Sequence, residues 1–121
     1  MTVDRAGSPP KPDIDPAQFF ALDMRVGRVV DVEAFPEARA PALKLTVDFG
    51  PEIGTLRTSA QVTSYSADQL TGRLVVGAVN LGPKRIAGFT SQFLVLGSID
   101  QDGTVRLLQP EPGAAPGCPI A

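Results

Sequence analysis

The sequence predicts an all-β fold, a small closed barrel of about five or six short strands. Apolar and polar residues alternate along several segments, which is typical of half-buried strands. Turn residues separate these segments at short intervals, and helix start signals occur at only two brief sites. The chain has 121 residues, of which 43% are hydrophobic. That is enough for one core, so we expect a single folded domain.

Residues 1–13 contain three prolines and scattered charges, so we expect them to form a flexible leader before a domain at 14–121. A short helix should open this domain. Asp15 supplies a capping carboxylate and Pro16 suits the first helical position. These two residues predict one or two helical turns over Ala17–Leu22.

The first strand is predicted over Met24–Phe35, and it should be long and strongly curved. Gly27 and the adjacent pair Val29-Val30 indicate a bend or a β-bulge within it. The loop Pro36–Pro41 follows this strand. The apolar residues expected to share one face of the strand are Val26, Val30, Val32 and Ala34.

The later segments continue the strand pattern. Leu43–Phe49 has the cleanest alternation, and Arg73–Leu81 is a nearly continuous apolar run, as expected of a strand covered on both sides. Ser66 and Gln69 form a capping-box pattern, which predicts one helical turn closed by Gly72. The other predicted strands are Leu56–Val62, Phe93–Ile99 and Thr104–Leu108.

Turn and tail residues complete the expected layout. Turns are predicted at Gly50–Gly54 and at Asp102-Gly103, the latter a hairpin signal, and a loop is predicted at Gly82–Arg85. The tail Gln109–Ala121 holds four prolines and two glycines, so it cannot be a central strand. One helix between the third and fourth strands is the element order of an OB-fold barrel. On strand spacing alone, a β-sandwich remains an alternative.

The residue types present in the chain predict a protein that is not an enzyme and needs no cofactor or metal. The chain has no histidine, which removes the commonest general base and metal ligand. The lone Cys118 cannot form an internal disulfide. The formal charge is −2, without the basic excess typical of strong nucleic-acid binders. Neither a membrane-length apolar run nor a secretory signal is present, so we expect a cytoplasmic protein without membrane insertion.

The carboxylates suggest structural roles. Asp31 and Glu33 are two residues apart on a strand and share a face, and a solvated strand face explains them better than a paired acid and base. Asp100 and Asp102 faintly resemble the start of a calcium loop, but the glutamate that would complete one is missing. The Asp-Gly turn explains them better.

The segment Asn80–Ser91 is the most suggestive binding site. It places Lys84 and Arg85 at the tip of a predicted loop, where a mobile point charge and a planar guanidinium could hold phosphate or stack on a base. Asn80 and Ser91 flank the loop with hydrogen-bonding groups. Arg57, Arg73 and Arg39 could extend this surface, and a solvated loop is the alternative for the whole segment.

Several motifs in these segments resemble the tRNA-binding-domain superfamily, and more specifically its CsaA-type export chaperones. Asp23–Glu33 (DMRVGRVVDVE) is similar to the opening motif of the superfamily. The resemblance covers about residues 14–121. Its other matching segments are Phe35–Arg39 with Pro41-Ala42, Lys44–Gly54, Ser59–Gln61, Gly72-Arg73, Val79–Leu81, Pro83-Lys84, Ser91, Leu107–Pro110, Gly117 and Ile120.

This resemblance implies an OB fold, a homodimer and chaperone activity linked to protein export. The implied partners are unfolded or precursor polypeptides, the export ATPase SecA and, through the wider superfamily, tRNA. Carried over to this chain, the tRNA groove would use Asn80, Lys84, Arg85 and Ser91, with Arg57 as a further member. The helix that carries Phe19 and Phe20 would contribute dimer contacts, because two adjacent phenylalanines cannot both face one narrow stripe.

Three functions therefore remain as alternatives. The first is an ATP-independent chaperone that captures extended polypeptides, and it is the preferred one. The second is a tRNA-binding module that acts in trans with the translation machinery. The third is a small dimeric scaffold that docks on another protein. The chaperone predicts polypeptide binding that is insensitive to salt, whereas tRNA binding should fall steeply as salt rises.

Overall fold

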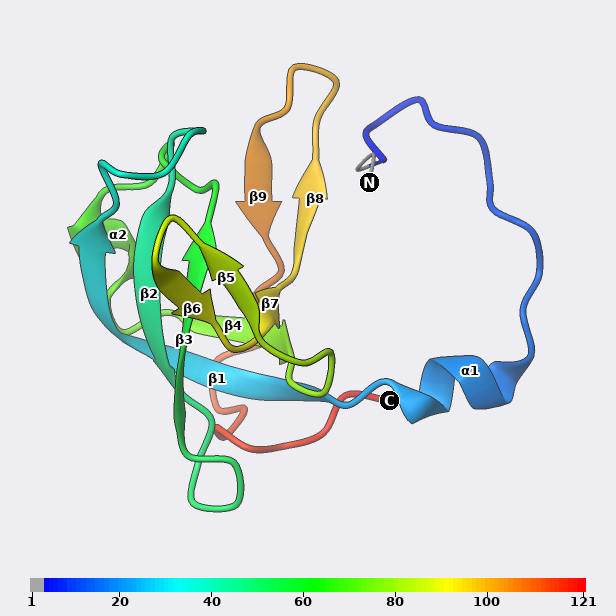
Figure 1. Cartoon of the computed structure of the whole chain (residues 1–121). Helices are drawn as coiled ribbons and strands as arrows, with labels where there is room; N and C mark the ends of the chain where they lie inside the picture. Colours follow the sequence, from blue (N-terminus) through cyan, green and yellow to red (C-terminus); the bar gives the residue numbers. More distant parts are fainter. Residues whose placement is uncertain (1–3) are drawn as a thin grey trace.

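The alternating segments form an antiparallel barrel in the computed structural model, which describes residues 4–121 (Figure 1). One sheet has the strand order β3-β2-β1-β4-β7, and two hairpins, β5-β6 and β8-β9, are attached to it. In chain order the elements are α1 (Pro16–Ala21), β1 (Met24–Ala34), β2 (Leu43–Asp48), β3 (Thr55–Ala60), α2 (Ala67–Leu70), β4 (Leu74–Ala78), β5 (Lys84–Ile86), β6 (Phe89–Ser91), β7 (Leu94–Val95), β8 (Gly97–Ile99) and β9 (Val105–Leu107).

The barrel closes where the segment between β6 and β7 crosses β3. The backbone N–H of Gln92 donates to the carbonyl of Arg57 at 2.8 Å, and the Arg57 N–H donates to the Gln92 side chain at 2.9 Å. The buried hydroxyl of Thr58 donates to the carbonyl of Phe93 at 2.7 Å. These bonds join the two edges of the five-stranded sheet, so the predicted OB-fold barrel is confirmed.

The predicted bulge in the first strand is confirmed, but the predicted apolar face is wrong at Val30 and Ala34, which are exposed. The pairing of β1 with β2 shifts between Val29 and Asp31, so Val30 is an extra residue. This insertion changes which alternate residues point inward. Val29 lies in the core, Val30 is 47% exposed, and Val32 packs against the core again.

The core is mostly aliphatic and is centred on two aromatic rings. Phe49 and Phe93 meet edge to face, with ring centroids 4.9 Å apart. Gly27 and Gly77 make room for them. A Cβ on Gly77 would lie 2.7 Å from Phe49 Cζ, and one on Gly27 would lie 2.8 Å from Phe49 Cε1. The buried residues around these rings are Val29, Leu45, Val47, Ala60, Val62, Leu70, Val75 and Leu107.

The strand predicted at Phe93–Ile99 is divided in the structure. Leu96 separates β7, which completes the barrel, from β8, which turns away and pairs with β9. The predicted hairpin turn is confirmed. Gly103 has a φ of 90°, and its N–H donates to the carbonyl of Asp100 at 3.0 Å. Figure 1 shows this hairpin projecting from the barrel.

The tail runs along an edge of β1, as expected of a segment that cannot be a central strand. The Gly117 N–H donates to Val26 at 2.8 Å, and the Val26 N–H donates to Cys118 at 2.9 Å. The Arg25 guanidinium donates to the Gly117 carbonyl at 3.1 Å and pairs with Asp23 at 2.6 Å. The hydrogen bond that Arg25 donates to the Asp23 carboxylate raises the pKa of Arg25 above its ordinary value. The tail therefore covers the part of β1 that β2 leaves open.

The short helix α1 forms as predicted and lies outside the barrel (Figure 1). The Asp15 carboxylate accepts from the Ala17 N–H at 3.0 Å, and the Gln18 side chain accepts from the Asp15 N–H at 3.1 Å. None of the helix residues is buried. Phe20 is 69% exposed and Phe19 is 39% exposed. In residues 4–121 there is no helix with the length and apolar character needed to cross a membrane.

Candidate binding surface

A hairpin that sequence analysis missed shapes the candidate surface. The predicted loop Gly82–Arg85 is wrong at its end, because Lys84 and Arg85 belong to β5, which pairs with β6. Ala87 and Gly88 connect the two strands with φ values of 47° and 80°. Two consecutive left-handed residues are typical of a two-residue hairpin turn. The sequence signal for this hairpin turn was weak because alanine, unlike asparagine or glycine, rarely adopts the left-handed conformation.

The strand geometry separates the two predicted cations. Consecutive residues of a strand point to opposite faces, so Lys84 shares a hairpin face with Phe89 and Ser91, whereas Arg85 lies on the other face. Arg85 donates to the Thr90 hydroxyl at 3.2 Å. Both cations are exposed. They therefore do not form one tip, and Lys84 alone faces the side of the hairpin that packs toward β3.

Phe89 anchors this hairpin on the barrel. Its buried ring meets Phe35 edge to face with centroids 5.5 Å apart. The Arg57 guanidinium lies 4.9 Å from the Phe89 centroid, and the Lys44 ammonium lies 5.1 Å from it and 4.8 Å from the Phe35 centroid. Such cation–π contacts hold the cations in place while leaving them accessible. We call Lys44, Arg57 and Lys84 the cationic face.

One carboxylate lies against this face. Glu33 is directly opposite Lys44 across the β1–β2 pair and lies 3.5 Å from Arg57 Nη2. Asp31, its predicted neighbour on the same face, is opposite Thr46. Both carboxylates are exposed. Glu33 thus serves as an ion-pair partner on a solvated strand face, which is the role preferred from the sequence.

Two other predicted site residues are engaged in structural hydrogen bonds. The Asn80 carbonyl accepts from the Asp23 N–H at 2.8 Å, and its amide donates to the Ala21 carbonyl at 2.8 Å. Asn80 thereby fixes the junction between α1 and β1. The buried Ser91 hydroxyl accepts from the Ser59 N–H at 2.9 Å. Of the predicted set, the structure brings Arg57, Lys84 and Ser91 together near β3 and places Asn80 elsewhere.

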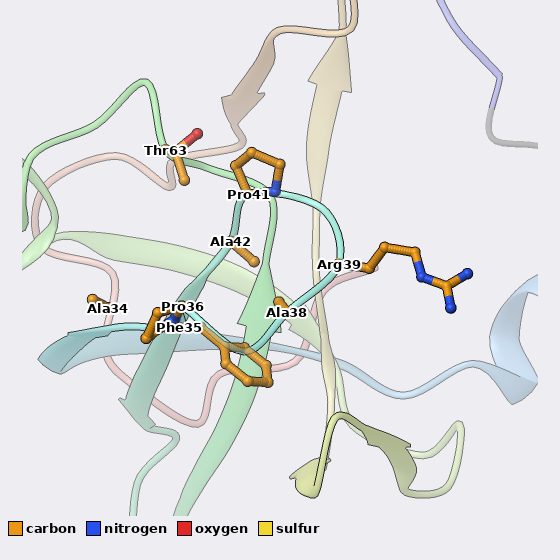
Figure 2. A pocket seen from close by; sticks show the side chains of 8 residues that line it. All are labelled: Ala34, Phe35, Pro36, Ala38, Arg39, Pro41, Ala42 and Thr63. Carbon is orange, nitrogen blue, oxygen red and sulfur yellow. The ribbon is translucent and has the colours of Figure 1, made fainter.

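A shallow hollow is lined by the side chains that Figure 2 shows. We call it the loop hollow. Its volume is about 340 Å³, and it lies in the loop between β1 and β2. Figure 2 shows Arg39 extending outward from this loop, away from the Phe35 ring. Phe35 also lies beneath Lys44, so this one ring borders both the hollow and the cationic face. The lining residues are Ala34, Phe35, Pro36, Ala38, Arg39, Pro41, Ala42 and Thr63.

The remaining candidate residues have structural partners. Asp102 Oδ1 accepts from the Thr104 N–H at 2.9 Å, and this bond lowers the pKa of the Asp102 carboxyl. Asp100 pairs with Arg106 at 3.3 Å. The Arg73 guanidinium stacks 5.0 Å from the Tyr65 ring centroid. Among residues 4–121 no group of three His, Cys, Asp or Glu side chains could hold a metal ion.

Comparison with known proteins agrees with the resemblance that the sequence motifs indicated. Residues 24–119 match the family described as "Putative tRNA binding domain". The CsaA chaperone protein of Picrophilus torridus is 45% identical, with a TM-score of 0.86, and the match covers 90% of this chain and 100% of that one. Chaperone CsaA of Bacillus anthracis str. Ames is 43% identical, with a TM-score of 0.86, 91% of this chain covered and 100% of that one.

Curated relatives include much longer proteins. Methionine–tRNA ligase 1 of Sorangium cellulosum (strain So ce56) is 38% identical over 112 residues, which are 93% of this chain and 16% of the ligase. Methionine–tRNA ligase of Neisseria meningitidis serogroup C is 33% identical over 100 residues, 82% of this chain and 14% of the ligase. This chain therefore corresponds to a small part of those enzymes.

The barrel, its cationic face and its apolar hollow define an OB-fold binding domain, a class whose matching family is not a catalytic one. The chain belongs to the tRNA-binding-domain family, and within that family it is of the CsaA type. The resemblance that the sequence motifs indicated is confirmed.

Proposed function

We propose that this chain is an ATP-independent chaperone that binds extended segments of unfolded or export-precursor polypeptides. The observation that carries the proposal is that Phe35 both lines the loop hollow and lies beneath Lys44 of the cationic face. An apolar side chain of the client would enter the hollow, while Lys44 and Arg57 would hold carbonyl or carboxylate oxygens next to it. The likeness to CsaA chaperones supports this function.

The size of the hollow implies weak binding. Complete burial of one apolar side chain contributes about 1.5–3 kcal/mol, and a shallow, open hollow provides less than complete burial. Binding through one hollow would therefore be weak and rapidly reversible, which allows release without a nucleotide cycle. A homodimer would place two hollows on one particle and raise the affinity for a long client through effective concentration.

The outer surface of the barrel offers a place for a second copy. Leu22, Met24 and Ala78 form a small cluster there with Leu96 and Ile120. Leu94, which pairs with Ala78, is 53% exposed, and Phe20 lies on the adjoining helix. A second copy of the chain would cover the exposed side chains of Leu94 and Phe20 in a self-complementary interface. Docking of such a dimer on SecA is part of the proposal and rests on the family resemblance.

A substitution in the loop hollow tests the chaperone function. Ala38→Glu places a charge among the lining residues, and Ala40→Glu is the matched control because Ala40 belongs to the same loop without lining the hollow. We expect Ala38→Glu to weaken binding of reduced, carboxymethylated α-lactalbumin about tenfold, which corresponds to about 1.4 kcal/mol. Fluorescence anisotropy measures this affinity, and light scattering measures suppression of aggregation. Equal affinity of both variants would contradict the proposal.

A tRNA-binding module that acts in trans with the translation machinery is the second candidate, favoured by the family match and the cationic face. It predicts that Lys84→Ala weakens tRNA binding and reduces the slope of log K against log salt by about 1. Arg106→Ala, on the β8–β9 hairpin, is the control. A salt titration with tRNA and with unfolded α-lactalbumin separates the two functions. An unchanged slope for Lys84→Ala would exclude the cationic face as the tRNA site.

A further inference from the structure

The leader contacts the β8–β9 hairpin. The Ala6 N–H donates to the carbonyl of Ile99 at 2.9 Å, and the Arg5 guanidinium donates to the carbonyl of Gln101 at 3.3 Å. A turn supports these contacts, because the Ser8 N–H donates to the Arg5 carbonyl at 3.0 Å and the Ser8 hydroxyl accepts from the Arg5 N–H at 3.1 Å. Figure 1 shows the leader extending from α1 around to this hairpin. Residues 1–3 lie outside the described part of the chain.

The contact occupies an open strand edge. Within residues 4–121, β8 pairs with β9 alone. The Asp100 N–H donates to the Thr104 carbonyl of the same hairpin at 2.9 Å. Because hydrogen-bonded and non-hydrogen-bonded pairs alternate along an antiparallel ladder, the N–H and C=O groups of Gly97 and Ile99 point away from β9. An edge of this kind presents N–H and C=O groups to any extended chain. The Ala6 N–H uses one of these groups, the carbonyl of Ile99.

The hairpin tip suits a basic side chain. The turn carries two carboxylates, Asp100 and Asp102, and the Thr104 N–H favours the ionised form of Asp102. Gly103 leaves space for a guanidinium, because a Cβ there would lie 3.3 Å from Arg5 Nη2. A cation docked here meets a peptide carbonyl within an acidic turn. The chemistry therefore selects a segment in which a basic residue directly precedes a residue that donates its N–H to the edge, as Arg5 precedes Ala6.

We propose that the outer edge of β8 is a binding site for a polypeptide segment in which a basic residue directly precedes an N–H donor, and that residues 5–8 occupy this site, as a turn, within the same chain. This inference deepens the proposed polypeptide-binding function by adding a second contact point for a client. The docked leader residues are all exposed, so another segment with the same chemistry can displace them. The leader thus acts as an intramolecular competitor, and the free fraction of the site sets the apparent affinity for clients.

The test uses a fluorescein-labelled, N-acetylated peptide with the sequence of residues 4–13 as the probe. Its affinity is measured by anisotropy for the full chain and for the full-length variant Arg5→Ala/Ala6→Pro, which lacks the guanidinium and the N–H donor. We expect the variant to bind the probe at least about threefold more tightly, because its own leader no longer competes. Asp13→Asn is the control variant, since Asp13 lies outside the docked turn, and it should bind like the parent chain.

A second measurement locates the bound probe. In two-dimensional NMR spectra, we expect the peptide to shift the amides of Gly97 and Ile99 most strongly, and a peptide N-methylated at the Ala6 position to produce no shift. Equal affinity of the parent chain and the double variant, or shifts confined to the loop hollow, would overturn the inference. The Ala38→Glu variant tests the loop hollow and not the β8 edge. Failure of the chaperone proposal can therefore be distinguished from failure of the proposal for the β8 edge.

Discussion

Phe89 shows how one residue organises the candidate surface. Its ring lies beneath Lys44 and Arg57 and against Phe35. Both cations would otherwise repel each other and move freely in water. Holding them over aromatic faces keeps their positions fixed, and the pairing of Arg57 with Glu33 balances part of the local charge. The cationic face is therefore a product of aromatic packing as much as of charge.

A double-mutant cycle measures how much the Phe89 ring contributes to holding Lys44 in place. We expect Phe89→Leu to lower the free energy of unfolding by about 1–3 kcal/mol, because it removes an aromatic pair and two cation–π contacts. Combined with Lys44→Gln, the two changes should show a coupling energy of about 0.5–1 kcal/mol in urea titrations. The same cycle with the distant Arg106→Gln serves as the control. Additive effects in the Lys44 cycle would show that its ammonium gains nothing from the ring.

At the scale of elements, the hairpins determine where the ligand-facing groups lie. The β5–β6 hairpin turns Lys84 toward β3 and Arg85 away from it. The β8–β9 hairpin projects its acidic turn from the barrel (Figure 1). Asp102 stabilises that turn by accepting the Thr104 N–H, which lowers the pKa of its carboxyl below the ordinary value of 3.8. The turn therefore depends on an ionised carboxylate.

This dependence predicts acid sensitivity of the β8–β9 turn. A carboxyl with a lowered pKa stabilises the fold fully above its ordinary pKa, and that stabilisation is lost as the pH falls through the lowered value. We expect the Thr104 amide resonance to titrate with a midpoint below pH 3.8, followed by NMR. The variant Asp102→Ala should abolish this titration. A midpoint above 3.8 would show that the hydrogen bond does not favour the charged form.

At the scale of the whole molecule, barrel closure requires two glycines at the centre. Gly27 and Gly77 lie on adjacent strands, and both face the ring of Phe49. Protein interiors are close-packed, so a single added methyl group must displace its neighbours. Phe49 also packs on Phe93, which follows the crossing that closes the barrel. Two residues without side chains therefore leave the space that the ring of Phe49 fills at the centre of the barrel.

A methyl group at position 77 tests this arrangement. Gly77→Ala would place its Cβ 2.7 Å from Phe49 Cζ and 2.9 Å from Phe93 Cδ2. We expect the free energy of unfolding to fall by about 1–3 kcal/mol through overpacking, measured by urea denaturation. Phe49→Leu creates space at the same point, so the double variant should be more stable than the sum of the two changes predicts. Strict additivity would refute direct contact between the two sites.

The proposed homodimer is also a property of the whole molecule. Leu94→Asp introduces a charge into the exposed apolar surface near α1, and we expect it to convert the dimer into monomers in sedimentation velocity. Val30→Asp is the matched control, because Val30 is 47% exposed and Leu94 is 53% exposed, but Val30 lies at the bulge of β1. Dissociation by both variants, or by neither, would contradict an interface at Leu94.

The sequence by itself determined the features that depend on near neighbours. The capping boxes at Asp15 and Ser66 and the Asp102-Gly103 turn join residues within four positions of one another, and the alternation at Leu43–Phe49 repeats every two residues. The order of these elements favoured the OB barrel and left a β-sandwich as an alternative, and the ordered motifs indicated the family. Local patterns carry this information because backbone geometry and hydrogen bonding act over short separations.

Only the tertiary structure decided which side chains meet. The bulge at Val30 reversed the facing of the residues after it, and β5–β6 pairing placed Lys84 and Arg85 on opposite faces. Asn80 bonds to Asp23, 57 residues away. The physical reason is that a single inserted residue changes strand facing, and distant partners are brought together only when the barrel closes. The binding surface therefore forms only when the barrel closes, and no short segment specifies it alone.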